Sequence, residues 1–216
     1  AAMRERLVDA DQKYGDSASS RLVLARSLAR LHTEGLEDDA RGLAEKEGPT
    51  HLVDRLVASQ LLSQHESQKT SELLGQLAVD PLPVVASAAL ERLTEINPEE
   101  AIEPGWAALE SPDAKLRRLG IQSIVHQADK SVVDRLAEMM NDNHTEVRTQ
   151  ARTVLVDLAQ ADAALDPLIR AAAEAMLGTD FWRGQQQAIL LLVALDHKRA
   201  AGRLVQLLDF PRPESY

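Results

Sequence analysis

The chain has 216 residues and a formal charge of −10, from 24 Lys and Arg against 34 Asp and Glu. This acidic balance argues against a general nucleic-acid binder, because phosphate contacts need clustered Lys and Arg. The absence of cysteine from the sequence excludes disulfides, thiolate metal sites and cysteine nucleophiles. The apolar residues are mostly Leu, Ala, Val and Ile, a composition that is typical of helical proteins.

Residues 1–19 predict an N-terminal capping helix and a linker, because the stretch 3–14 is amphipathic. The chain opens without an initiator Met, which is typical of a fragment. No segment has the composition of a signal peptide, and no apolar run reaches the roughly 18 residues that span a bilayer. We therefore expect a soluble segment with no membrane contact, and the sequence leaves its compartment open.

After residue 19 the chain alternates between two kinds of amphipathic helix, here called A and B. The B helices are expected at 20–33, 52–65, 82–96, 113–127, 144–159 and 182–196. The A helices are expected at 71–79, 98–109, 131–140, 164–177 and 199–208. Pro, Asp and Asn are frequent in the turns between the helices. Asp129 and Asp162 are the predicted N-caps of the A helices that follow them.

The B helices share a pattern with a period of 31 residues. An apolar residue at position one is followed by a small residue at position five and a large aliphatic residue at position nine, as in Val147, Ala151 and Leu155. These positions share one arc of a helix, so we expect them to be buried against neighbouring helices. The other small and large pairs are Ser27 and Leu31, Ala58 and Leu62, Ala89 and Leu93, Gly120 and Ile124 and, after a slip of six residues, Ala188 and Leu192. Position one is apolar at Val23, Val85 and Leu116 but is broken by Asp54 and Gly184.

This repetition predicts an all-α fold, a right-handed α-solenoid in which helix pairs bury their apolar sides on one another. The array is expected to cover residues 20–210, as about six repeats with the last one incomplete, and residues 211–216 to begin a truncated further repeat. Leu204, Leu207 and Leu208 give the last A helix an apolar face. We therefore expect the protein to continue, or another chain to cover this end.

The turn and B helix carry the pattern Asp-x-x-x-x-Val-Arg-x-x-Ala-x-x-x-Leu at Asp142, Val147, Arg148, Ala151 and Leu155. This pattern resembles the HEAT-repeat family, and the short period is similar to the repeats named after phycobilisome lyase subunits. The resemblance implies an armadillo-like superhelix with the B helices along its concave side. HEAT-like proteins mostly act as scaffolds, adaptors or regulatory subunits, while a few relatives are chromophore lyases or DNA glycosylases. The departures from the pattern are Asp54 for an aliphatic residue, Gly120 for Ala, and the stretched repeat at 182–188.

No catalytic residue, cofactor or metal site is predicted. The six His residues show no His-x-x-x-His or His-Glu-x-x-His spacing, and the glycines form no phosphate-binding loop. The adjacent carboxylates at 38–39 and 99–100 suit the first turn of a helix, where they interact favourably with its dipole.

A row of arginines follows position one, at Arg55, Arg117 and Arg148. Two interpretations stand. Each guanidinium pairs with a turn carboxylate such as that of Asp142 and joins adjacent repeats, or the row forms a ligand-binding ladder.

The expected contact surface is the concave face of the B helices, built mainly from positions three, seven and ten. Trp182 lies beside Arg183, where the repeat slips, and is expected either to be an exposed hot spot for a partner or to cover the enlarged gap between two repeats. Trp106 is expected to pack within an A helix. The predicted partner-binding residues are Gln60, Ser87, Glu91, Arg118, Gln122, Val125, Thr149, Arg152, Thr153, Val156 and Gln186.

The leading functional prediction is a non-enzymatic scaffold or adaptor module, part of a larger protein, that binds a protein or peptide on this concave face. One alternative is a lyase-like enzyme or enzyme subunit that holds a ligand in the concave groove. Another is nucleic-acid binding through Arg117, Arg118, Arg148 and Arg152, against which the acidic composition counts. The sequence leaves the oligomeric state open.

Overall fold

The computed structural model describes Leu7, residues 18–46 and residues 48–196. Over these residues the chain is all-α, with eleven α-helices and no strand, as the sequence predicts. Most of the expected capping segment 1–19, the expected A helix at 199–208 and the truncated repeat at 211–216 lie outside the described residues.

The chain divides into two compact units, residues 1–126 and 127–216. The helices of the first unit are α3 (Ala18–Arg30), α4 (Leu36–Ala44), α5 (Leu52–Leu61), α6 (Gln68–Ala78), α7 (Pro83–Ile96), α8 (Pro98–Ala108) and α9 (Ala114–Ile124). Those of the second are α10 (Lys130–Met139), α11 (Thr145–Ala161), α12 (Asp166–Leu177) and α13 (Trp182–Ala194).

The predicted helices correspond closely to these elements. The B helices are α3, α5, α7, α9, α11 and α13, and the predicted A helices that fall within the described residues are α6, α8, α10 and α12. Four B helices, α3, α5, α9 and α13, end earlier than predicted; for α5 and α9 the reason is the short 3₁₀ turn that follows, at Leu62–Gln64 and Val125–Gln127. The helix α4 is a further A helix that the repeat pattern does not predict; it has nine residues and begins after Gly35, whose φ is 75°.

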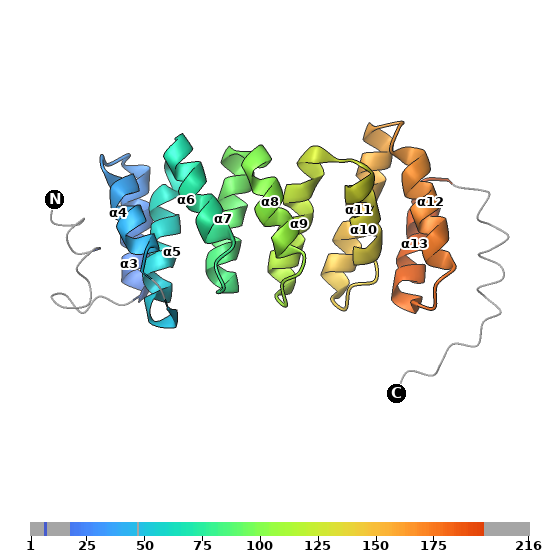
Figure 1. Ribbon diagram of the computed structural model, residues 1–216, viewed down its shortest axis with the longest axis horizontal. Helices are drawn as coiled ribbons and strands as arrows, with labels where there is room; N and C mark the ends of the chain where they lie inside the picture. Colours follow the sequence, from blue (N-terminus) through green and yellow to red (C-terminus); the bar gives the residue numbers. More distant parts are fainter. Residues whose placement is uncertain (1–6, 8–17, 47, 197–216) are drawn as a thin grey trace. The chain divides into compact units, whose positions relative to one another are not determined.

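Each unit has two layers of helices. In the first unit α3, α5, α7 and α9 pack against one another in chain order, and α4, α6 and α8 form the second layer (Figure 1). In the second unit α11 packs on α13 and α10 on α12. Each A helix also packs on the B helix that follows it, so the apolar sides of both meet in the middle of the unit.

The predicted burial of positions five and nine is confirmed in five of the six B helices, from α5 to α13. In α3 the predicted register is wrong. Val23, Ser27 and Leu31 are exposed, with 71% of Leu31 accessible, whereas Arg21 and Ala25 are buried. Position one of α3 is therefore Arg21, a charged residue that a search for apolar residues passes over.

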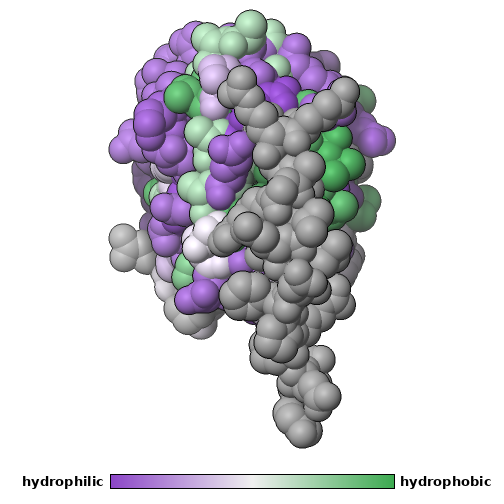
Figure 2. Space-filling view, turned by 90° about the vertical axis from the view of Figure 1, so that its right-hand side faces the viewer, coloured by the Kyte–Doolittle hydropathy of each residue, from purple (hydrophilic) through white to green (hydrophobic). Residues whose placement is uncertain are grey.

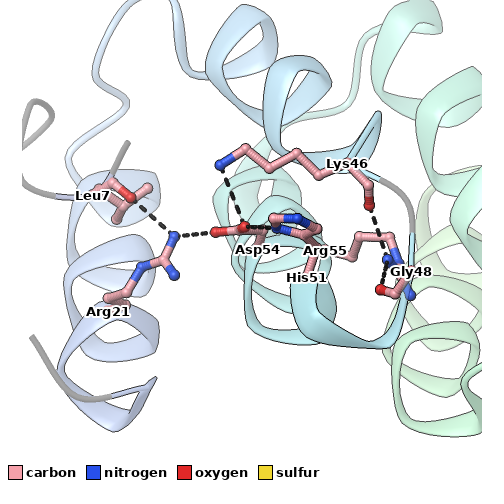
Figure 3. Close-up of polar contacts among 7 residues, drawn as sticks. All are labelled: Leu7, Arg21, Lys46, Gly48, His51, Asp54 and Arg55. Carbon is pink, nitrogen blue, oxygen red and sulfur yellow. Dashed lines mark hydrogen bonds and ion pairs between the residues drawn. The ribbon is translucent and has the colours of Figure 1, made fainter. Parts of the chain in front are cut away.

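Arg21 is buried because it pairs with Asp54, which occupies position one of the next B helix. Figure 3 shows the guanidinium of Arg21 pointing from α3 to the Asp54 carboxylate on α5 and to the backbone carbonyl of Leu7, 3.1 Å from Nη2. His51 Nδ1 and Lys46 Nζ lie 2.9 Å and 3.3 Å from Asp54 Oδ2. Position one is therefore charged in two consecutive B helices, Arg21 in α3 and Asp54 in α5, and the two charges compensate each other.

The environment of Asp54 also sets its acidity. Burial alone would raise the pKa of the Asp54 carboxyl, but the hydrogen bonds with Arg21 and His51 and the positive charges of Arg21 and Lys46 outweigh it. The pKa therefore lies below its ordinary value of 3.8, and the carboxylate is ionised in the folded chain at neutral pH.

A repeated turn precedes four of the B helices. In each, a side-chain oxygen accepts a hydrogen bond from the backbone N–H two residues later, which fixes the turn that leads into the helix. The pairs are Asp80 with Leu82 (2.8 Å), Ser111 with Asp113 (3.1 Å), Asp142 with His144 (2.7 Å) and Thr179 with Phe181 (3.3 Å). Asp80 and Asp142 therefore occupy the same position of this turn, two repeats apart.

The two predicted N-caps have different outcomes. Asp129 caps α10 by accepting from the backbone N–H of Val132 at 3.0 Å. Asp162 accepts from Ala164 at 2.8 Å, but α12 begins only at Asp166, so Asp162 is the C-cap residue of α11 and the prediction is wrong.

Two glycines let the helices α8 and α9 approach each other closely. A Cβ at Gly120 of α9 would lie 2.7 Å from the carbonyl oxygen of Gly105 in α8, and one at Gly105 would lie 2.6 Å from Ser123 Cβ. Because the obstacle at Gly120 is backbone, a side chain there would force the helices apart. This explains why Gly120 stands where the other repeats carry Ala.

We predict that Gly120→Ala destabilises the first unit by about 1–3 kcal/mol, the usual cost of overpacking. The matched control is Gly75→Ala in α6, where the nearest atom to an added Cβ is Leu93 Cδ2 at 4.0 Å. That control should gain roughly 0.5–1 kcal/mol from the better helix propensity of Ala. Urea unfolding followed by circular dichroism measures both changes, and equal effects of the two substitutions would contradict the close α8–α9 packing.

We also predict that Asp54→Asn costs about 3 kcal/mol at neutral pH, because Arg21 would stay buried without its counter-charge. Since the pKa of Asp54 is lower in the folded chain, its contribution is present above about pH 4 and is lost as the pH falls through the folded value. The wild-type chain should therefore lose more stability on acidification than the variant. Unfolding midpoints measured across this range, with the exposed Glu91→Gln as control, check it; identical pH profiles for wild type and Asp54→Asn would refute the assignment.

Candidate interaction surface

The predicted contact residues lie on the outer side of the B helices, opposite the buried arc, with one exception. Glu91, Gln122, Thr149, Thr153 and Gln186 are exposed, and Gln60, Arg118, Val125, Arg152 and Val156 are partly buried. Ser87 is buried, with 4% of its surface accessible, so its place in the predicted surface is wrong. The physical reason is that α7 has α5 on one side and α9 on the other, and a small residue at the edge of the buried arc is covered.

Two of the predicted contact residues already bind a neighbouring B helix. Arg26 Nε of α3 donates to Gln60 Oε1 of α5 at 2.7 Å, and Arg152 Nε of α11 donates to Gln187 Oε1 of α13 at 3.0 Å. A third link joins Thr94 of α7 to Ser123 of α9, with their hydroxyl oxygens 2.8 Å apart. These bonds hold adjacent B helices together, so Gln60 and Arg152 have a structural role before any partner binds.

The arginine row has a structural role. Arg55, Arg117 and Arg148 are buried, and each donates to backbone carbonyls of the turn before its own helix. The acceptors are Lys46 and Gly48 for Arg55 (both 2.9 Å), Ser111 (2.8 Å) and Pro112 (3.0 Å) for Arg117, and Asp142 (2.8 Å) for Arg148. Gln185 of α13 replaces the arginine at this position and donates to the carbonyl of Thr179.

The expected pairing with a turn carboxylate is confirmed for Arg55, whose Nε lies 2.6 Å from Asp80 Oδ2 in the turn of the following repeat. Arg148 bonds to the backbone carbonyl of Asp142 and to the hydroxyl of Thr145 at 2.9 Å. Because these guanidinium groups are buried and bonded, they do not present a ladder to a ligand, and Arg117 and Arg148 are not placed to contact phosphates.

In the described part of the second unit, the exposed large hydrophobic side chains all lie on α13 or just before it. Trp182, Leu190 and Val193 follow one another at helical spacing and are 58%, 44% and 65% accessible, and Phe181 just before them is 56% accessible. The guanidinium carbon of Arg183 lies 5.1 Å from the centre of the Trp182 ring, a cation–π distance. We call Trp182, Leu190 and Val193 the α13 stripe. Figure 2, which views the side of the molecule where α12 and α13 lie, shows apolar patches among polar surface.

The alternative role for Trp182, covering the gap of the stretched repeat, is wrong. At position one of α13 the chain has Gly184, and a Cβ there would lie 2.4 Å from Met176 Sδ and 3.2 Å from Asn141 Cβ. The methionine of α12 and the side chain of Asn141 therefore close the gap, while the Trp182 ring stays accessible. Trp106, by contrast, is half-buried in α8, as expected for a packing residue.

The remaining polar candidates sit where their helices place them. Asp38-Asp39 and Glu99-Glu100 lie in the first turns of α4 and α8, as predicted. Among the described residues, no group of three or more His, Asp or Glu side chains is arranged to hold a metal ion. The centroids of the His32 and His65 rings lie 6.5 Å apart, a proximity that the sequence pattern does not predict. No helix in the described part of the chain is long and apolar enough to cross a bilayer.

Comparison with known proteins gives information on the fold alone. No protein-family model matches the chain, and no curated protein matches it. A solved structure described as an engineered protein from the Northeast Structural Genomics Consortium is similar, with a TM-score of 0.53 and 17% identity over 89% of this chain and 96% of that one. At this identity the likeness supports the all-α architecture and carries no function.

We predict that the two tryptophans respond differently to a soluble quencher. In a Trp106→Phe variant the remaining Trp182 should emit at long wavelength and be quenched efficiently by acrylamide, because 58% of its surface is accessible. In a Trp182→Phe variant the half-buried Trp106 should be quenched less. Equal quenching of the two variants would contradict the exposed position of the Trp182 ring.

Proposed function

We propose that the chain is a HEAT-like right-handed α-solenoid that acts as a non-enzymatic scaffold or adaptor and binds a segment of another protein on the outer side of its B helices. The helix pairs, the two layers within each unit and the repeated turn support the HEAT-like architecture. Because a pair of this kind buries its apolar sides on its neighbours, apolar side chains left on the outer surface of a B helix call for another explanation.

The observation that carries the functional proposal is the α13 stripe. Single exposed apolar residues are ordinary, but Trp182, Leu190 and Val193 share one side of one helix. Tryptophan and arginine are among the residue types enriched at binding hot spots, and here Arg183 lies over the Trp182 ring. The neighbouring helix α11 adds Thr149, Thr153 and Val156, so the outer side of this layer offers an apolar centre with polar neighbours.

An amphipathic helix is the partner segment that fits this surface best. Its apolar residues at every third or fourth position would lie along the stripe, and a carboxylate at its edge would meet Arg183. The polar threonines and glutamine beside the stripe would accept or donate hydrogen bonds at the rim.

The test is selection of helical peptides from a display library on the immobilised chain, followed by affinity measurement of the selected peptides. Trp182→Ala should weaken binding by about 30-fold, which corresponds to a hot-spot loss of about 2 kcal/mol. The matched control is Val79→Ala, because Val79 after α6 has the same accessible fraction, 58%, away from the B layer. Peptides that bind equally well to wild type and Trp182→Ala, or that are lost only in Val79→Ala, would overturn the proposal.

A further inference from the structure

The segments that follow α3 and α5 bring two histidines together in the first unit. The ring centroids of His32 and His65 lie 6.5 Å apart, and the ring planes are tilted by 54°. Each histidine comes eleven residues after position one of its helix, which is Arg21 in α3 and Asp54 in α5. Because α3 packs directly on α5, the same position of two consecutive repeats places the two imidazoles side by side.

The backbone of His32 has a conformation that is uncommon for a histidine. Its φ is 46°, in the left-handed region. The N–H of His32 donates to the carbonyl of Ala29 at 3.0 Å and that of Thr33 to the carbonyl of Leu28 at 3.5 Å, the two bonds of a Schellman motif. Glycine is the usual residue at this position, because a Cβ strains the left-handed conformation. The chain therefore carries an imidazole at a point where the backbone favours glycine.

The ring of His65 has a nitrogen without a partner. His65 is partly buried, and its Nδ1 atom is buried with no hydrogen-bond partner among the described residues. A buried polar atom that bonds to nothing has lost its interaction with water without compensation. Since a ring nitrogen of a neutral imidazole is the commonest metal ligand in proteins, an ion bound at Nδ1 would supply the missing interaction.

A carboxylate lies close to this ring. Hydrogen bonds from the hydroxyls of Ser67 and Thr70, followed by the nearby charge of His65, hold the pKa of the Glu37 carboxyl below its ordinary value of 4.5. Glu37 is therefore ionised at neutral pH, and its negative charge favours a cation beside His65.

The positive charge of Arg92 at the same place is already compensated. Its Nη2 atom donates to the backbone carbonyl of His65 at 3.3 Å. Its guanidinium is paired with Glu95 at 3.1 Å and lies 3.8 Å from Glu66. Two carboxylates thus face one guanidinium, so Arg92 does not repel a cation from the histidine pair.

The distance between the rings suits a shared metal ion. Two imidazoles that bind one ion at the usual Zn–N distance of about 2.0–2.1 Å have ring centroids roughly 5–6.5 Å apart, from a tetrahedral to a linear arrangement. The observed 6.5 Å is at the wide end of this interval, and His32 is exposed, so rotation of its side chain brings the rings closer.

We propose that His32 and His65 bind a divalent transition-metal ion such as Zn²⁺, through Nδ1 of His65 and a ring nitrogen of His32. Imidazole ligands favour Zn²⁺, Cu²⁺ and Ni²⁺ over Mg²⁺ and Ca²⁺. Water completes the coordination, because no set of three His, Asp or Glu side chains in the described part of the chain is arranged to hold an ion. The site goes beyond the proposed function and is independent of it, since it belongs to the first unit and the α13 stripe to the second.

Isothermal titration calorimetry of the purified chain with zinc chloride tests the site. His32→Gln and His65→Gln should each weaken zinc binding by at least about ten-fold, because one of the two protein ligands is lost. The matched control is His126→Gln, an exposed histidine after α9, which should leave the affinity unchanged. A wild-type chain that binds no zinc, or equal affinities of the wild type and the two ligand variants, would overturn the proposal.

His32→Gly separates metal binding from folding. Glycine adopts a φ of 46° without strain, so without zinc this variant should unfold at a higher urea concentration than the wild type. Saturating zinc should raise the urea midpoint of the wild type and leave that of His32→Gly unchanged. A variant that is less stable than the wild type without zinc, or that zinc stabilises as much as the wild type, would contradict the proposal.

Nitrogen-15 NMR of the histidine rings identifies the ligand atoms. Addition of zinc should shift the ring signals of His32 and His65, with the metal on Nδ1 and the proton on Nε2 of His65. The signals of His126 and His144, which are exposed elsewhere in the chain, should stay in place. Zinc-dependent shifts that spare His65, or that leave its proton on Nδ1, would refute the assignment.

Discussion

The structure depends on one constraint: a helix pair of this size cannot bury two apolar sides within itself, so it must bury them against neighbouring pairs. The B helices meet this constraint with a small residue at position five and a large one at position nine, both buried from α5 to α13. Where α8 and α9 approach closely, at Gly105 and Gly120, even a methyl group is excluded. Four of the turns are then fixed locally by a side-chain oxygen at their start, and in three of these an arginine or glutamine also binds the carbonyls of the turn.

Much of this arrangement was predictable from the sequence, because periodic apolar residues report burial directly. The parts that were not predictable involve polar atoms whose partners are distant or are backbone groups. Arg21 is buried only because Asp54, 33 residues later, accepts its charge, so an apolar pattern placed α3 in the wrong register. The acceptors of Arg117 are backbone carbonyls, which carry no residue type to search for. Ser87 was misplaced for a related reason, since its burial follows from the flanking helices.

The candidate surface, too, was predictable only in part. The sequence identified the outer side of the B helices and singled out Trp182, and it offered two roles for that ring. Only the packing of Met176 against Gly184 decides between them, because it fills the gap that the indole would otherwise cover. The accessible stripe on α13 thus lies on the other side of the helix from its buried arc. The proposed function treats that side as a place for a helix from another molecule.

Hydrogen–deuterium exchange followed by mass spectrometry tests this central claim most directly. The chain would be compared with and without a saturating helical peptide selected on it. The account predicts slower exchange in the segment 182–194 when the peptide is bound, with α4 and α6 unchanged as internal references. Slower exchange confined to the A helices, or no change in 182–194 under any condition, would contradict it.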